Sequence, residues 1–202
     1  MGYHPKPSKT VLIVKNSALK EQAQEIFGQT GITIDTTGER HLGAVVGTQS
    51  FKELYVKKKI DQWVEDVNQL SLIAQDEPQI ALSAYTKALC MRWCFVQRTI
   101  SGISHLFEPL EDAIRNNFIP AVIGRNVSEI ERQMLALPVR FGGIGIQNPV
   151  KTADTEFEAS TVVTENLKRI IVNQENNFEN MDEGGVHEAI NKTKQEKGKR
   201  FT

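Results

Sequence analysis

The sequence has little of what marks a secreted, membrane-spanning or uniformly basic protein. Two cysteines among 202 residues are too few for a disulfide framework, which favours a reducing compartment. No apolar run approaches the roughly 18 residues of a membrane-spanning helix, and the N-terminus has no apolar signal core. We therefore expect an intracellular protein of the cytoplasm or the nucleus, with no membrane partner.

Charge is distributed unevenly along the chain. The formal net charge of −1 excludes a uniformly basic nucleic-acid-binding protein, but it allows a local basic face. The first 59 residues carry nine Lys or Arg against five Asp or Glu. Contacts with phosphate groups are therefore expected in the N-terminal part of the chain.

The first 48 residues have the pattern of a small β unit with one inserted helix. Val11 to Val14 are apolar and mostly β-branched, which favours a strand. Asn16 or Ser17 can cap a helix that ends near Phe27, with Gly28 as its stop.

Two further strands are expected after this helix. Residues 31–36 alternate between apolar and polar types, as a half-buried strand does. Residues 37–39 (Thr-Gly-Glu) predict a turn, and residues 41–47 predict the next strand. The glycines in that strand stand where a side chain would crowd a close neighbour.

From residue 49 onward the pattern becomes helical. Apolar residues recur every third or fourth position from about Ser50 to Gln75, which is the spacing of one face of a long helix. Two more stripes predict a second helix that Ser101-Gly102 ends, and a third helix that starts late or kinks at Pro109. The predicted core residues of these three helices are Val56, Ile60, Trp63, Val67, Leu70 and Ala74, then Ile80, Ala84, Ala88, Met91 and Phe95, then Leu106, Phe107, Leu110, Ile114 and Phe118.

Two shorter patterns follow before the polar tail. The segment from Ser128 to Glu131 has the form of a capping box, which predicts a short fourth helix that stops before Pro138. Residues 141–146 form a glycine-rich loop, and a fifth helix is expected over residues 150–172. The segment 173–202 has few apolar residues, so we expect disorder or a loose helix there.

Candidate catalytic and metal-binding groups are few. Cys90 and Cys94 lie one helical turn apart, but the scattered histidines complete no metal site, so buried free thiols are expected. The acidic neighbours at 65–66 and 111–112 do not face one another on a helix, and we expect them on a solvated face. The glycines of the segment 142–145 lack the Lys-Ser/Thr ending of a P-loop, so a tight turn is expected.

A lysine cluster near the start of the long helix supports two interpretations. Lys57, Lys58 and Lys59 are consecutive, and Lys52 precedes them by about one and a half turns. Lysine near a helix N-terminus is unfavourable for the helix dipole unless an anion lies nearby. The cluster is either a solvated basic run or a phosphate-binding surface.

Four segments together resemble the C-terminal part of a reverse transcriptase of the non-LTR (LINE-like) retrotransposon kind. "GYHPKPSKTVLIV" at residues 2–14 resembles the family's Gly-x(3)-Asn-x(2)-Lys-Thr segment, although Lys6 stands in place of the Asn. "RHLGAVVG" at residues 40–47 is similar to the Leu-Gly hairpin of the primer grip, and the three helices from about residue 50 to 118 resemble the thumb. "LALPVRFGGIGIQNP" at residues 135–149 is similar to the Leu-Pro…Gly-Gly-x-Gly segment after the thumb.

The resemblance implies an α+β fold, mainly α. A small N-terminal antiparallel sheet with one inserted helix would be a palm remnant (1–48), in which residues 11–14 pair with residues 42–46. A thumb-like helical bundle with the glycine-rich segment would follow (49–149), then a C-terminal helix (150–172) and the polar tail (173–202).

The resemblance also assigns roles to individual residues. Lys9 would lie near the outgoing pyrophosphate, as a catalytic residue of the complete enzyme. The primer's 3′ end would contact the hairpin, and the helix lysines would face the outgoing duplex without regard to base sequence. The hairpin residues are His41, Leu42 and Gly43, and the lysines are Lys52, Lys57, Lys58 and Lys59.

The catalytic centre of such a polymerase is missing from this sequence. The family enzyme uses Mg²⁺ held by paired carboxylates, and we find no aromatic-x-Asp-Asp segment in the 202 residues. No metal site or cofactor is expected in this chain, which should be inactive as a polymerase alone. A separate palm-containing chain is a further partner that the resemblance leaves open.

Two function classes follow from the sequence. The first is a fragment of a retroelement RNA-directed DNA polymerase that retains its contacts with an RNA/DNA primer–template duplex. The second is a helical protein-interaction module, unrelated or repurposed, that has no nucleic-acid function and associates through an exposed apolar surface.

Overall fold

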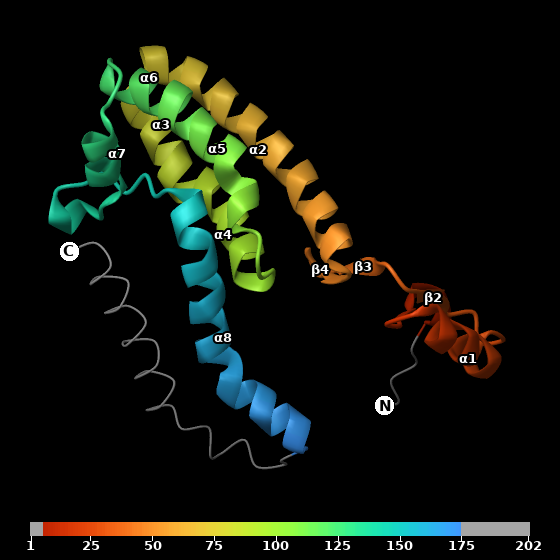
Figure 1. Cartoon of the computed structure of the whole chain (residues 1–202). Coiled ribbons are helices and arrows are strands. Elements are labelled where there is room, and N and C mark those ends of the chain that lie inside the picture. Colours follow the sequence, from red (N-terminus) through yellow and green to blue (C-terminus); the bar gives the residue numbers. More distant parts are fainter. Residues whose placement is uncertain (1–5, 175–202) are drawn as a thin grey trace. The chain divides into compact units, whose positions relative to one another are not determined.

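A computed structural model describes residues 6–174 of the chain, except for the side chain of Asn166 (Figure 1). The chain divides into two compact units, residues 1–58 and residues 59–202. The fold is α+β and mainly helical, with a small antiparallel sheet near the N-terminus and a helical bundle after it, as predicted. The expectation for the tail after Gln174 lies outside the described residues.

The first unit begins with two short strands joined by a helix. The Asn16 carboxamide caps this helix by accepting a hydrogen bond from the Leu19 amide at 2.9 Å, and Gly28 follows its last residue, as predicted. The strands pair in parallel. A helix inserted between two strands carries the chain back to the starting edge, so the second strand runs in the same direction as the first. The elements are η1 (Pro7–Lys9), β1 (Val11–Ile13), α1 (Ser17–Phe27) and β2 (Thr33–Asp35).

The antiparallel sheet of this unit is a separate hairpin. Strands β3 (Gly38–His41) and β4 (Ala44–Gly47) pair in antiparallel register, with His41 opposite Ala44. The predicted pairing of residues 11–14 with 42–46 is therefore wrong, because β1 pairs with β2 and β4 with β3. The predicted turn at residues 37–39 is displaced, since the chain bends at residues 36 and 37 and residues 38 and 39 already belong to β3. The predicted strand over residues 41–47 is wrong in its first part, because the hairpin turns at Leu42-Gly43 and β4 begins only after this turn.

Helix α2 (Gln49–Asp76) matches the predicted long helix to within one residue at each end. Five positions of its predicted stripe are buried and Leu70 is half-buried. A large aromatic side chain of the stripe, Trp63, packs against Trp93 with 6.0 Å between ring centroids. The spacing of apolar residues thus located this core face correctly, because a long helix with one apolar stripe offers only one face to bury.

The second predicted helix exists, but its core face was assigned wrongly. Elements α3 (Pro78–Ala84), the π-helical turn η2 (Tyr85–Leu89) and α4 (Cys90–Thr99) follow one another without a break. All five predicted stripe residues are exposed. The buried face instead carries the larger aromatic rings, since burying a ring removes more apolar area from water. Its members are Ala81, Tyr85, Leu89, Trp93 and Val96.

The third helix begins late, as predicted from Pro109. A short helical turn, η3 (Ser104–Phe107), leads into α5 (Glu108–Ala113), which has proline in its first turn. The π-helical turn η4 (Ile114–Phe118) and α6 (Ile119–Ile123) continue it. All five residues of the predicted stripe are buried, and Phe118 stacks on Tyr85 with 4.7 Å between ring centroids.

The predicted capping box and glycine turn are both present after α6. Helix α7 (Glu129–Ala136) starts at Ser128 with reciprocal bonds to Glu131. The chain then turns tightly through η5 (Val139–Phe141) and the glycine-rich loop, and the amides of Ile144 and Ile146 both donate to the Leu135 carbonyl. A β-carbon at Gly143 would overlap the Leu137 carbonyl oxygen, which explains why glycine occupies this position.

Helix α8 (Pro149–Asn173) matches the predicted fifth helix. It packs along α4 and against η3 and α5 within the second unit (Figure 1). The buried Gln97 of α4 donates a hydrogen bond to the Pro149 carbonyl at 2.8 Å, and Arg98 forms an ion pair with Glu156 at 2.9 Å. The start of α8 is thus tied to α4.

Candidate nucleic-acid interface

Three of the predicted contact residues come together at the turn of the β3–β4 hairpin. His41 is the last residue of β3, and Leu42 and Gly43 form the two-residue turn. Both turn residues have positive φ, 49° for Leu42 and 86° for Gly43, as a type I′ hairpin turn requires. Leu42 is 86% exposed.

An exposed leucine at this position is unfavourable for the isolated unit. The left-handed region suits Asn or Gly and is uncommon for leucine. Backbone strain of this kind clusters at sites that bind ligands. Leu42 also presents an apolar side chain to water without any packing contribution to the core. The conformation and the exposure of Leu42 therefore do not favour the stability of the hairpin.

Tyr55 of α2 fixes the position of the hairpin turn. Its hydroxyl donates a hydrogen bond to the Gly43 carbonyl oxygen at 2.7 Å, in partly buried surroundings. No motif of the sequence marks Tyr55 as a contact residue. Its position next to the buried Val56 predicts only that Tyr55 is a half-buried aromatic residue. No rule of sequence spacing predicts that its hydroxyl bonds the carbonyl of Gly43, twelve residues earlier.

The four helix lysines do not lie on one face of α2. Successive residues of an α-helix are about 100° apart around the axis, so Lys57, Lys58 and Lys59 spread over more than half of the circumference. Lys52 and Lys59, which are seven residues apart, share a helix face and are half-buried. Lys57 and Lys58 are exposed, and Lys59 is the first residue of the second unit.

Lys9 is not brought to the hairpin turn. It ends the short turn η1 and is exposed. Because β1 and β2 run in parallel, Lys9 lies at the end of this strand pair opposite to the point where the chain leaves β2 for β3. The structure places an exposed arginine, Arg40, next to His41 on β3 instead.

The chain between β2 and the hairpin is held by a carboxylate. Asp35 accepts hydrogen bonds from the Thr37 hydroxyl at 2.7 Å and from the amides of Thr36 and Thr37. These donors, the Thr37 hydroxyl above all, lower the pKa of Asp35 from 3.8 to about 2. The carboxylate is therefore charged at neutral pH, and it fixes the entry to β3.

The cysteines and the acidic neighbours that the sequence offers as candidate groups have roles in packing and ion pairing. Cys90 and Cys94 form no disulfide bond and are half-buried rather than fully buried, and burial raises the pKa of Cys90. The expectation of a solvated face fails for Glu111, whose side chain is 12% exposed and bonds Arg132 through both carboxylate oxygens at 2.7 Å. Within residues 6–174, no group of three or more His, Cys, Asp or Glu is placed to hold a metal ion.

Comparisons with known proteins identify no relative of this chain. No protein-family model, curated protein or solved structure matches the chain. In the part of the chain that the structure describes, no helix has the length and apolar character needed to cross a membrane.

Proposed function

We propose that the chain binds an RNA/DNA primer–template duplex, as the primer-grip and thumb part of a LINE-like reverse transcriptase. The observation that carries the proposal is the hairpin turn, where an exposed Leu42 adopts a left-handed conformation and Tyr55 holds the adjacent Gly43 carbonyl. The four segments that resemble the family, and that occur in the same order along the chain, support the same function. We propose that the chain carries it out inside the cell.

The proposed contact does not depend on base sequence. The turn offers an apolar side chain and a glycine backbone that can approach a sugar-phosphate chain closely. Exposed cations of the same unit, Arg40 on β3 and Lys57 and Lys58 on α2, would neutralise phosphate groups. Such contacts position a duplex without distinguishing one base pair from another.

The proposal concerns binding and not catalysis. Two-metal phosphoryl transfer needs carboxylates that hold Mg²⁺ ions a few ångströms apart, and the described residues include no such group. We therefore derive no catalytic step from this chain, and we give Lys9 no role in it. Polymerisation would require a palm with those carboxylates, for which a separate palm-containing chain is the proposed partner.

Salt dependence of duplex binding tests the proposal. We expect weak binding at low salt that falls steeply as salt rises, because bound lysines release counterions from the duplex. Substituting Lys57, Lys58 and Lys59 together by Ala should reduce the slope of log K against log salt by about 1 to 3, since each phosphate contact contributes about 0.9. A fluorescence anisotropy titration measures both quantities.

The matched control substitutes three exposed lysines elsewhere, Lys15, Lys20 and Lys87, by Ala. This variant has the same net charge as the first one, so it should keep the wild-type slope if the contact is local. Equal slopes for the two triple variants, or no binding of the wild type at low salt, would reject duplex binding by the start of α2.

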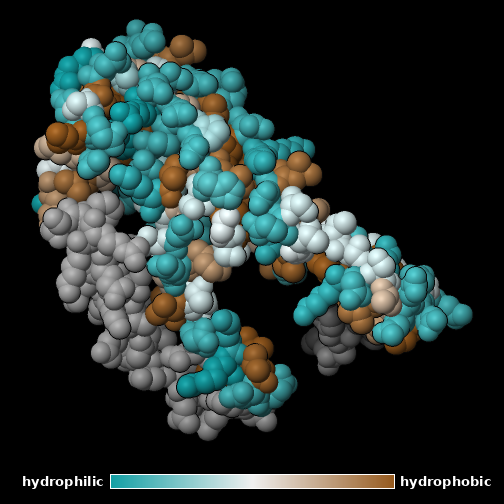
Figure 2. Space-filling view, viewed as in Figure 1, coloured by the Kyte–Doolittle hydropathy of each residue, from teal (hydrophilic) through white to brown (hydrophobic). Residues whose placement is uncertain are grey.

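A second candidate function has its own supporting observation. The face of α3–α4 that was expected in the core is exposed, with Ile80 62%, Met91 56% and Phe95 44% accessible. Figure 2 shows hydrophobic residues in brown among the hydrophilic surface of the helices. Ala84 and Ala88 continue the stripe, and exposed apolar patches commonly mark protein contacts. A helical protein-interaction module is the function that this stripe favours.

Light scattering separates the second candidate from the first. An interaction module with a bare apolar stripe should self-associate, and Met91→Lys should restore the monomer. Lys87 is exposed and lies four residues before Met91. Lys87→Met replaces a charge by an apolar side chain, the reverse of Met91→Lys, and should strengthen association. A monomer at all concentrations for the wild type would count against this candidate.

A further inference from the structure

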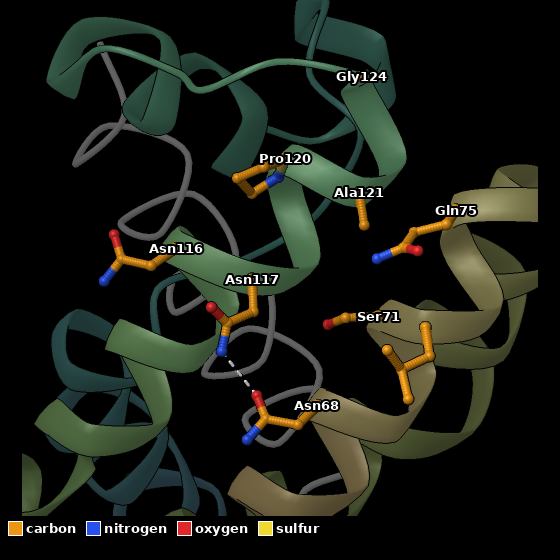
Figure 3. Close-up of a pocket in the computed structure, with 9 residues that line it drawn as sticks. Asn68, Ser71, Gln75, Asn116, Asn117, Pro120, Ala121 and Gly124 are labelled. Carbon is orange, nitrogen blue, oxygen red and sulfur yellow. Dashed lines mark hydrogen bonds between the residues drawn. The ribbon is translucent and has the colours of Figure 1, made fainter.

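The second unit has a surface hollow that takes part in neither of the two candidate functions. It has a volume of about 640 Å³ and lies between α2 and the η4–α6 segment (Figure 3). Among the described residues, none of those that line it is charged. It combines side-chain amides and a hydroxyl with apolar groups, and the residues that line it include Asn68, Ser71, Leu72, Gln75, Asn117 and Pro120.

The amides of this hollow retain unused donors and acceptors. Asn117 donates from Nδ2 to the Asn68 Oδ1 at 2.7 Å, which leaves the Asn117 oxygen and the Asn68 amino group for a ligand. Gln75 makes no hydrogen bond to another described residue through its amide. The Ser71 hydroxyl donates to the Val67 carbonyl at 2.7 Å, so its lone pairs remain as acceptors. Figure 3 shows Asn68, Ser71 and Gln75 on one side and Asn117 on the other.

The backbone that presents Asn117 is unusual. Residues 114–118 form a π-helical turn, and Pro120 follows, which has no N–H to donate to the Asn116 carbonyl. Turns of this type occur frequently at functional sites. Asparagine is also a poor helix former, so two successive asparagines in the middle of a helical segment do not serve helix stability.

The apolar lining supplies a surface for a flat ligand. Leu72 is 66% exposed, and Pro120 and Ala121 lie on the opposite element. A ligand that fits has apolar faces and an uncharged edge with a donor beside an acceptor. A carboxamide pairs with both groups of such an edge, and adenine offers one through its N6 amino group and N7.

We propose that this hollow binds an unpaired adenine base, with the Gln75 amide pairing its N6–N7 edge and Leu72 and Pro120 contacting its faces. The phosphate groups of the nucleotide stay outside, because no cation among the described residues lines the hollow. The site does not depend on the duplex contact of the hairpin, so either proposal can fail without the other.

Titration of the full chain with adenosine tests the proposal. The side-chain amide resonances of Asn68, Gln75 and Asn117 should shift in a saturable manner. 7-Deazaadenosine, which lacks the N7 acceptor, should bind at least about tenfold more weakly, as expected for the loss of one bidentate pair. Gln75→Glu should weaken adenosine by a similar factor, whereas Gln79→Glu, on α3 and outside the hollow, should not.

Two other small molecules test the competing occupants. N-acetylalanine methylamide represents a peptide backbone, and methyl glucoside represents a sugar. Saturable shifts with either of them but not with adenosine would overturn the proposal, as would equal affinities for adenosine and 7-deazaadenosine. Absence of any saturable shift up to the solubility limit of adenosine would show that the hollow is only solvated surface.

Discussion

At the scale of single residues, the hairpin turn combines features that sequence analysis could and could not predict. The grouping of His41, Leu42 and Gly43 followed from their adjacency, and Gly43 is a natural turn residue. The residue pattern predicted a strand over residues 41–47 after a turn of Thr-Gly-Glu at 37–39, whereas the resemblance implied a hairpin at Leu42-Gly43. The Tyr55 contact was missed because it depends on how the hairpin packs on α2.

Replacing Leu42 by asparagine should stabilise the hairpin. Asn adopts the left-handed conformation of a type I′ turn more readily than leucine does, and relief of that strain should contribute about 1 kcal/mol. The amides of β3 and β4 should then exchange more slowly with solvent. The control Val46→Asn alters an exposed residue of β4 that has no positive φ. Unchanged or faster exchange in Leu42→Asn would show that the turn carries no strain.

The same substitution should weaken duplex binding if the exposed leucine contacts the primer. A stabilised hairpin with reduced affinity would separate a binding role of Leu42 from a folding role. Unchanged affinity would restrict the proposed contact to the backbone of Gly43 and to the cations. The anisotropy titration described for the lysine variants measures this affinity.

The Asp35 carboxylate should give the loop before β3 a defined pH dependence. Its pKa is lowered from 3.8 to about 2, so its stabilising effect is complete above about pH 4 and is lost as the pH falls towards 2. Thr37→Val removes the hydroxyl donor and should raise the pKa of Asp35 towards 3.8. Thr36→Val is the control, because Thr36 bonds Asp35 through its backbone amide alone. A carboxyl NMR titration with equal effects of both variants would contradict this account.

At the scale of helices and strands, the periodicity of apolar residues predicted where the elements lie in the sequence. It did not predict as well which strands pair or which helix faces are buried. The bounds of α1, α2, α7 and α8 followed from caps and stripes. The buried face of α3–α4 did not, because that helix has apolar residues on two faces and the larger rings of Tyr85 and Trp93 occupy the core. Strand pairing also depends on the path of the intervening helix, which no local pattern contains.

The buried Arg132 joins three elements, and its removal should be costly. Its guanidinium bonds both oxygens of Glu111 on α5 and the carbonyls of Ile146 and Gln147 before α8. Arg132→Met leaves a nearly buried carboxylate without its partner, which should lower the free energy of unfolding by about 3 to 5 kcal/mol. Urea unfolding followed by circular dichroism measures this loss.

An exposed ion pair provides the comparison for Arg132. Arg92→Met breaks the pair between Arg92 and Asp66, in which the arginine side chain is 58% exposed, and should cost about 0 to 1 kcal/mol. The double variant Glu111→Leu, Arg132→Met should recover part of the loss, because it leaves no unpaired carboxylate. Equal costs for Arg132→Met and Arg92→Met would show that the buried pair does not join the elements.

At the scale of the whole molecule, the sequence predicted the fold class but not which surfaces remain exposed. Composition and helical spacing were sufficient for a mainly helical chain after a small sheet. The exposed stripe on α3–α4 and the amide-lined hollow depend on which faces pack within the second unit, and therefore on the sum of many contacts. Each of these surfaces supports a different proposal. A measurement that reports on every part of the chain can therefore show which surface binds a partner.

Hydrogen exchange of the intact chain, with and without a primer–template duplex at low salt, tests the central claim most directly. We predict slower exchange of the backbone amides in the β3–β4 hairpin and in the first turns of α2, with little change along α3–α4. Unchanged exchange in the hairpin, or protection confined to the exposed stripe of α3–α4, would contradict the proposed duplex contact.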